Sequence, residues 1–155
     1  MPLIRSKLFT GASLKIRYNK DSRLATKVDI RFGTALKEID PRATYGVLIL
    51  DTSLKASYTK QELDSLRKDG KALDIKPAWD GEAYRFAWVV TNMDDRLDKT
   101  LYAVVYKELD GAISLGTPKA FSISSLSSYY LANGLATSQE VEEVLTNLKN
   151  NKMGK

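Results

Sequence analysis

The sequence predicts a mainly antiparallel β-protein, and three features of its 155 residues carry that prediction. Apolar and polar side chains alternate in several short runs, which is the period of a half-buried strand. Two Asp-Gly pairs, at residues 80–81 and 110–111, separate such runs, as the pairs of type I′ hairpin turns do. Helical periodicity is confined to two short stretches. About seven or eight strands at this spacing favour an immunoglobulin-like β-sandwich, with a β-barrel as the alternative.

Each strand is placed by its alternation or by an unbroken apolar run. We expect strands over residues 12–18, 28–33, 45–50, 72–79, 82–90, 101–109, 112–115 and 121–123. The unbroken run at 45–50 is typical of a central strand, and Pro77 confines its strand to a sheet edge or a bulge. The inward-facing side chains predicted to form the core are Leu14, Ile16, Val28, Ile30, Phe32, Val47, Ile49, Phe86, Trp88, Leu101, Ala103 and Val105.

Two helices interrupt the strand pattern. Thr59 with Glu62 forms a capping box, and Gly70 suits the position after a helix, so a short internal helix is expected near residues 60–68. Thr137 with Glu140 predicts the start of a C-terminal amphipathic helix near residues 138–150. Its apolar stripe consists of Val141, Val144, Leu145 and Leu148.

The expected organisation is an N-terminal arm (1–10), a sandwich domain (11–134) and the C-terminal helix (135–155). The arm has no period, and a helix this short is marginal in isolation, so both need something to pack against. That neighbour is either the chain's own sheet or a partner subunit. The residues predicted to contact a partner subunit are Ile4, Arg5, Lys7, Phe9, Val144, Leu145 and Leu148.

The chain contains neither His nor Cys. It therefore lacks a side chain that ordinarily titrates near neutral pH, the usual activator of a serine nucleophile, thiolate chemistry and the common zinc ligands. We expect no catalytic residue, no cofactor site and no metal site, and hence a protein that is not an enzyme. Apolar runs are far shorter than the ~20 residues that span a bilayer, so no membrane partner is expected.

Three local patterns have a functional reading and an ordinary structural one. The acidic stretch at residues 92–98 suits calcium, but it lacks the spacing of a calcium-binding loop and is better explained as a solvated loop. The aromatic residues around Asp80-Gly81 suit a platform for binding a sugar, but alternating aromatic residues usually belong to a core. The serine-rich stretch at 122–128 reads as a polar strand end, and one of Tyr129 and Tyr130 should be exposed.

Positive charge is concentrated in the first 42 residues. They hold ten Lys and Arg against four Asp and Glu, a net charge of +6 in a chain whose total is +5. A basic face of this kind suits nucleic acid or an acidic partner subunit. Because these cations alternate with apolar residues, an ordinary solvated strand face explains them as well.

The order of several segments resembles a module found in surface proteins of Gram-positive gut bacteria and in some of their phages. Its members carry Gly-Ala-Ser-Ile-Arg-like, Ile-Arg-Phe, Tyr-Gly-x-Leu-Ile, Tyr-Arg-Phe, Thr-Asn-Ile-like and Ala-x-x-Tyr segments. The corresponding segments here lie at residues 11–17, 30–32, 45–49, 84–86, 91–93 and 103–106. The resemblance covers about residues 11–130, and the opening and last strands depart from the pattern. It implies a non-catalytic β-sandwich accessory module.

These observations favour a structural or accessory subunit of a large assembly, most simply a phage virion protein of the capsid-decoration or head-fibre type. Its expected partners are other protein subunits, in a homo-oligomer or a capsid-type lattice. No signal peptide is recognisable, so we expect a virion protein made in a host cytoplasm, with a bacterial cell surface as the alternative. A glycan-binding adhesive module is the second reading, and nucleic-acid binding through the basic first quarter is the third.

The predicted strand phase can be tested by truncation. Phe32→Ala and Phe86→Ala should each lower the free energy of unfolding by ~3–5 kcal/mol, because each leaves a cavity in a packed core. Denaturant unfolding measures this loss. A loss well under 1 kcal/mol at both positions would mean that the inward face is assigned wrongly.

Overall fold

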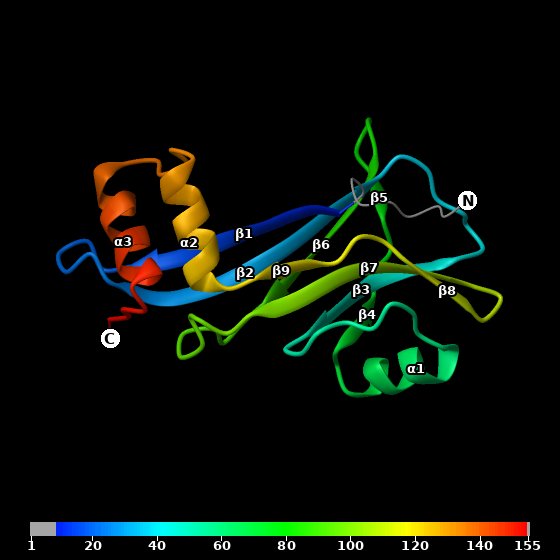
Figure 1. Cartoon of the computed structure of the whole chain (residues 1–155). Helices are drawn as coiled ribbons and strands as arrows, with labels where there is room; N and C mark the ends of the chain where they lie inside the picture. Colours follow the sequence, from blue (N-terminus) through cyan, green and yellow to red (C-terminus); the bar gives the residue numbers. More distant parts are fainter. Residues whose placement is uncertain (1–8, 155) are drawn as a thin grey trace. The chain divides into compact units, whose positions relative to one another are not determined.

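The computed structural model describes residues 9–154, and this part of the chain folds into two mainly antiparallel sheets and three helices (Figure 1). The strands are β1 (Phe9–Tyr18), β2 (Ala25–Leu36), β3 (Thr44–Leu50), β4 (Ala72–Asp74), β5 (Ala78–Trp79), β6 (Tyr84–Val90), β7 (Leu101–Leu109), β8 (Ala112–Leu115) and β9 (Lys119–Phe121). The helices are α1 (Lys60–Lys68), α2 (Ile123–Ala132) and α3 (Gln139–Lys149). In the described residues, no helix is long and apolar enough to span a bilayer.

The first sheet has the strand order β1-β2-β6-β5, and the second has the order β4-β3-β7-β8, with β9 also paired to β7. The pairings of β3 with β4 and β7, of β5 with β6 and of β7 with β8 are all antiparallel. The expectation of a mainly antiparallel, two-sheet β-protein is therefore confirmed. The central position of β3, predicted from its apolar run, is confirmed as well.

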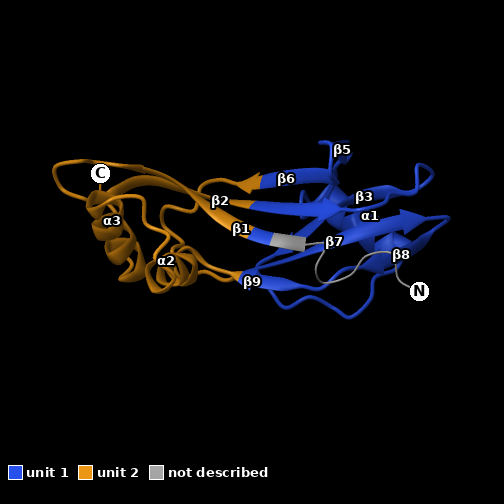
Figure 2. Cartoon of the chain, turned by 90° about the horizontal axis from the view of Figure 1, so that it is seen from above, with its two compact units in different colours: residues 1–11, 32–88, 101–120 blue, residues 12–31, 89–100, 121–155 orange. Residues whose placement is uncertain are grey.

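The described chain divides into two compact units, each assembled from three separate segments (Figure 2). Unit 1 comprises residues 9–11, 32–88 and 101–120, and unit 2 comprises residues 12–31, 89–100 and 121–154. Helix α3 thus shares unit 2 with helix α2 and with residues 12–31 and 89–100.

In unit 1, side chains from both sheets meet in one core. A small cavity of about 10 Å³ marks this meeting, and its lining residues are Phe32, Gly33, Thr34, Val47, Phe86, Trp88 and Val105. They come from β2 and β6 of one sheet and from β3 and β7 of the other. Face-to-face packing of this kind is what makes the unit sandwich-like.

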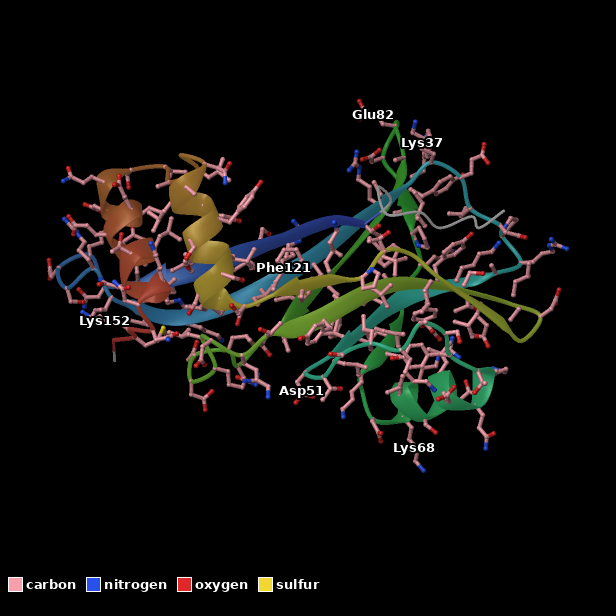
Figure 3. All side chains as sticks on the ribbon, in the orientation of Figure 1. Lys37, Asp51, Lys68, Glu82, Phe121 and Lys152 are labelled. Atoms are coloured by element: carbon pink, nitrogen blue, oxygen red, sulfur yellow. The ribbon has the colours of Figure 1, made fainter. Side chains whose placement is uncertain are left out.

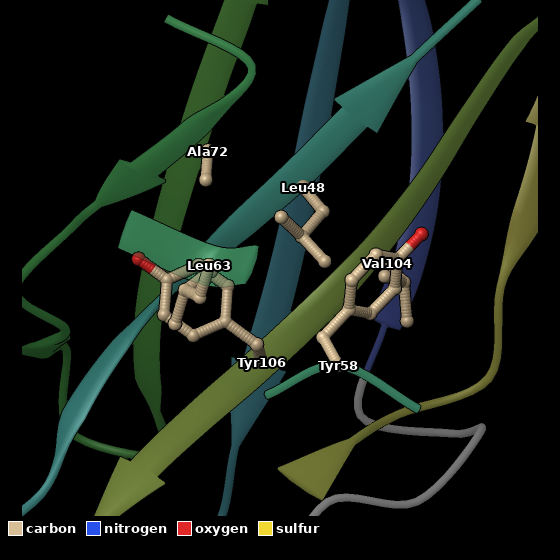
Figure 4. Packing of buried hydrophobic residues seen from close by; sticks show 6 residues of the cluster. All are labelled: Leu48, Tyr58, Leu63, Ala72, Val104 and Tyr106. Atoms are coloured by element: carbon tan, nitrogen blue, oxygen red, sulfur yellow. The ribbon is translucent and has the colours of Figure 1, made fainter. Parts of the chain in front are cut away.

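Helix α1 covers the opposite face of β3 and β7 (Figure 4). The cluster beneath it consists of Leu48, Tyr58, Leu63, Ala72, Val104 and Tyr106. Adjacent residues of a strand point to opposite faces, and Val47 and Leu48 are both buried. Strand β3 is therefore covered on both sides, which explains why its sequence is an apolar run without alternation.

Gly46 is required where β3 is most crowded. It lies opposite Tyr106 in the β3–β7 register and opposite Asp74 in the β3–β4 register. A Cβ atom at this position would collide with the carbonyl oxygen of Leu73 and with the phenol group of Tyr106. Only glycine leaves room for the aromatic ring.

In unit 2, helices α2 and α3 pack against each other, and this unit has its own core. Its buried apolar residues are Ala25, Val28, Ile30, Met93, Leu97, Ile123, Leu126, Val144, Leu145 and Leu148. Long-range hydrogen bonds close the unit: the Asn147 side-chain amide donates to the Arg23 carbonyl at 2.6 Å, and the Gly154 amide donates to the Ala25 carbonyl at 2.8 Å.

The Asp-Gly pairs at residues 80–81 and 110–111 both lie in hairpins, but with different turns. Asp110 and Gly111 both have positive φ, and Leu109 pairs with Ala112, so a two-residue type I′ turn is confirmed. At the other hairpin the closing pair is Trp79 with Tyr84, which leaves a four-residue loop. The carboxylate of Asp80 accepts hydrogen bonds from the amides of Glu82 and Ala83 there, so Asp80 keeps an ordinary φ.

Several expected elements differ in the structure. The strand expected over 72–79 is divided into β4 and β5, which belong to different sheets, with Pro77 between them. The strand expected over 121–123 lies earlier, as β9, and ends at Phe121. The serine-rich stretch expected to be a polar strand end belongs to helix α2, which begins with a capping box between Ser122 and Ser125. Helix α3 is capped by Ser138 and not by Thr137. The capping box of Thr59 and Glu62 and the positive φ of Gly70 agree with the prediction.

Most of the predicted core is buried. Leu14, Ile16, Ile49 and Trp88 are the exceptions, because each of them is only partly buried. Phe32 and Phe86 are buried, in agreement with the predicted strand phase. Burial of the opposite face of β3 and β7 under α1 was not predicted, because alternation alone assumes that one face of a strand meets water.

A buried hydroxyl in the unit 1 core predicts a stabilising substitution. Thr34 is 4% exposed, and its Oγ1 has no hydrogen-bond partner in the described chain. Thr34→Val keeps the shape and removes the unpaired hydroxyl, so it should raise the free energy of unfolding by about 1 kcal/mol in urea titrations. The matched control Thr34→Ser keeps the hydroxyl and removes a buried methyl group, so it should lower that free energy by about 1 kcal/mol. Destabilisation by Val would contradict the assignment of an unpaired hydroxyl.

Candidate functional site

The predicted partner residues are divided by the structure into two groups. Ile4, Arg5 and Lys7 lie outside the described residues, and Phe9 begins β1, with its side chain also outside the description. The other three belong to α3, and each is 0% exposed within its own chain. The expectation that Val144, Leu145 and Leu148 contact a partner subunit is therefore wrong, because the core of unit 2 occupies their surface.

The acidic stretch at residues 92–98 is used for structure. Asp94 Oδ1 accepts a hydrogen bond from the Val28 amide at 2.8 Å, which ties the loop to β2. Asp95 lies 4.0 Å from the guanidinium of Arg96, which itself donates to the Asn92 carbonyl. In the described residues, no group of three or more acidic side chains is gathered in a way that could hold a metal ion.

The serine-rich stretch caps and anchors helix α2. Ser122 and Ser125 exchange the two hydrogen bonds of the capping box. Ser124 Oγ bonds to the Leu148 carbonyl at 3.2 Å and to Asn151 Oδ1 at 2.7 Å, so it joins α2 to the end of α3. Ser127 Oγ donates to the Ile123 carbonyl one turn earlier. These hydroxyls are committed to backbone and amide partners, which is a structural role.

The aromatic residues around the first hairpin separate into a core group and a surface pair. Phe86 is buried, as expected for a core strand, whereas Trp88 is only partly buried. Trp79, on the two-residue strand β5, is 56% exposed. Its ring lies 5.0 Å from that of Tyr84, centroid to centroid, at an interplanar angle of 56°. We call these two residues the aromatic pair.

Charged side chains border the aromatic pair. Asp80 and Arg85 form an ion pair across the turn, and the Arg85 guanidinium also lies 3.7 Å from the Glu82 carboxylate. Glu82 stands at the tip of the hairpin (Figure 3). The amides of Ala83 and Glu82, and then Arg85, hold the pKa of Asp80 below its usual value. The hairpin thus presents an aromatic surface beside charged side chains of both signs.

Tyr129 and Tyr130 lie on α2, not on a strand. Tyr129 is 57% exposed, while the Tyr130 hydroxyl accepts a hydrogen bond from the Leu14 amide at 3.2 Å. The expectation that one of the two is exposed agrees with the structure, but the cause is the helix surface and not strand alternation. Leu135, in the connection from α2 to α3, is also exposed.

A cluster of ionisable residues joins α1 to the second sheet. Arg67 donates to Asp74 at 2.9 Å, to Glu108 at 2.7 Å and to Asp64 at 2.9 Å. Its guanidinium also lies 5.5 Å from the centroid of the Tyr106 ring. One cation thus joins helix α1 to strands β4 and β7, which flank β3 in the second sheet.

The pKa values of Tyr106 and Glu108 in this cluster are both shifted further from neutral pH. Burial, followed by the hydrogen bond to Asp74, raises the pKa of the Tyr106 hydroxyl. Burial on its own raises the pKa of Glu108, but the hydrogen bonds from Lys60 and Arg67 outweigh it and leave that pKa below its usual value. A phenol that stays protonated and a carboxylate that stays ionised form a clamp, whereas an acid–base pair needs groups that titrate near the working pH.

Removing the Glu108 charge should weaken the clamp. Glu108→Gln should lower the free energy of unfolding by about 1.5–3 kcal/mol at neutral pH, because hydrogen bonds to a charged group are lost. The folded-state pKa lies below the ordinary 4.5, so the contribution of ionised Glu108 is fully present above that pH and declines as the pH falls through the folded value. Urea unfolding across this range should show the difference from wild type shrinking in acid.

The exposed Glu142 on α3 provides the control, and Glu142→Gln should leave stability nearly unchanged at every pH. A Glu108→Gln effect that is equally large in acid and at neutral pH would contradict the role assigned to the ionised carboxylate.

Comparison with known proteins adds no assignment. No protein-family model matches the sequence, and no curated protein matches it either. The resemblance to the accessory module of Gram-positive gut bacteria and their phages therefore stays a prediction, and the function has to be argued from the surface of this chain.

Proposed function

We propose that this chain is a non-enzymatic structural subunit of a larger protein assembly, of the capsid-decoration or head-fibre type found in phage virions. An immunoglobulin-like strand arrangement and a virion location are parts of this proposal. The two-sheet antiparallel architecture supports it, because sandwich-like domains serve as scaffolds that present their edges and loops to other subunits.

The observation that carries the proposal is the exposure of Trp79. Tryptophan is among the residue types most enriched at the energetic centres of protein interfaces. Here it stands on the outermost strand of its sheet, supported by Tyr84 and bordered by the Asp80–Arg85 ion pair. An aromatic anchor with a charged rim is the usual anatomy of an interface patch.

Self-association provides the direct test. Sedimentation equilibrium over a range of concentrations should show wild-type protein forming oligomers. Trp79→Ala should weaken that association by about 30-fold or more, because truncating an interface anchor of this kind costs about 2 kcal/mol. Trp79 is exposed, so the variant should keep the wild-type unfolding curve.

Tyr129→Ala is the matched control, since Tyr129 is an equally exposed aromatic residue on unit 2. It should associate as wild type does. A wild-type chain that is monomeric at every concentration, or a Tyr129→Ala variant that loses association as fully as Trp79→Ala does, would contradict the proposed interface.

A glycan-binding adhesive module is the second candidate, and the same aromatic pair favours it. Two tilted rings beside a carboxylate and a guanidinium offer stacking and hydrogen bonding to a sugar. Titration of soluble glycans with tryptophan fluorescence as the signal distinguishes the two candidates. Saturable quenching in wild type that disappears in Trp79→Ala, with no change in oligomeric state, would favour the adhesive module.

A further inference from the structure

Strands β1 and β2 carry a second surface, distinct from the aromatic pair. Their only Lys and Arg residues are Lys15 and Arg17 on β1 and Lys27 and Arg31 on β2, and all four are exposed. In each strand they alternate with the more buried residues, so they share the face that points away from the core of unit 2. We call these four residues the basic face.

The charges of the basic face are unpaired. Elsewhere in the described chain the arginines form ion pairs, namely Arg23, Arg42, Arg67, Arg85 and Arg96. Arg17 and Arg31 are the two described arginines that have no carboxylate within ion-pair distance. The one acid in either strand is Asp29, which strand alternation places on the same face between Lys27 and Arg31. Its buried Oδ1 has no hydrogen-bond partner in the described chain, so one negative charge stands against the four cations. The face therefore keeps a net positive charge that the fold does not neutralise.

The composition of this face indicates the kind of partner. A protein interface needs an apolar or aromatic centre, but the large exposed apolar residues of the described chain, Trp79, Tyr129 and Leu135, all lie outside β1 and β2. Cations two residues apart on a strand are separated by about 7 Å, and neighbouring strands by about 4.8 Å. A compact array of cations without an apolar centre suits a densely charged polyanion.

We propose that the basic face binds the sugar–phosphate backbone of double-stranded nucleic acid without sequence preference. Guanidinium groups match phosphate oxygens in bidentate geometry, which favours Arg17 and Arg31 as the principal contacts. Single-strand binding relies on bases stacking on aromatic side chains, and the outward positions described in these strands hold no aromatic residue. Contacts of this kind fix position on a duplex but read no sequence.

The proposal predicts how steeply the binding constant falls as the salt concentration rises. If all four cations neutralise phosphates, the logarithm of the binding constant should fall with the logarithm of salt concentration with a slope of about −3.6. Affinity should then drop about 150-fold between 50 and 200 mM salt. With two cations removed the slope should be about −1.8, and the drop about 12-fold.

The experiment uses the full chain and a fluorescently labelled duplex of mixed sequence, with binding measured by anisotropy at several salt concentrations. The test variant is Arg17→Gln/Arg31→Gln. The control is Arg42→Gln/Arg96→Gln, which removes the same charge from exposed arginines outside the basic face. If the test variant fails to fold, Lys15→Gln/Lys27→Gln repeats the measurement on the other half of the face.

Parallel titrations use polyglutamate and vesicles of roughly 30% phosphatidylserine, since anionic membranes also attract Lys and Arg. Halving of the slope in the test variant, with the control at the wild-type slope, supports the proposal. No duplex binding at 50 mM salt, equal slopes in both variants, or tighter binding to polyglutamate or vesicles would overturn it. Trp79→Ala leaves the basic face intact and should bind the duplex as wild type does, so this inference and the proposed assembly role can fail separately.

Discussion

The contact of Tyr106 with Gly46 is the constraint on which the rest of unit 1 depends. The ring can lie against β3 only because position 46 has no side chain. From there the Tyr106 hydroxyl reaches Asp74 on β4, and the guanidinium of Arg67 lies over the ring. The same aromatic side chain belongs to the cluster that receives Leu63 of α1. Strand pairing, helix docking and the ionic clamp thus converge on one residue pair.

Features that depend only on neighbouring residues in the sequence could be predicted. The turn at Asp110-Gly111 and the capping box of Thr59 with Glu62 are determined by backbone chemistry within four residues, and both appear as expected. Helix α2 could not be recognised in the same way. Its inward positions include Ser127, whose buried hydroxyl donates a hydrogen bond to the Ile123 carbonyl on the preceding turn. A polar residue at an inward position interrupts the apolar periodicity by which a helix is recognised.

The surface was harder to predict than the fold, because exposure depends on which neighbours a residue acquires. Trp79 and Trp88 come from similar alternating runs, yet one stands on an edge strand while the other lines the core cavity. Val144, Leu145 and Leu148 illustrate the opposite error. Their amphipathic spacing correctly indicated a face that had to be covered, but no local signal says whether the cover belongs to the same chain.

The discontinuous make-up of unit 2 has a consequence for how the protein folds. The hydrogen bond from Asn147 to Arg23 joins residues 124 positions apart, and that from Leu14 to Tyr130 joins residues 116 positions apart. Contacts so distant in sequence form late, because a long loop must close before they stabilise anything. On the ribosome, residues 12–31 therefore cannot complete their packing in unit 2 until almost the whole chain has emerged. During that interval Val28 and Ile30 lack their final cover, which makes the nascent chain a natural client for chaperones.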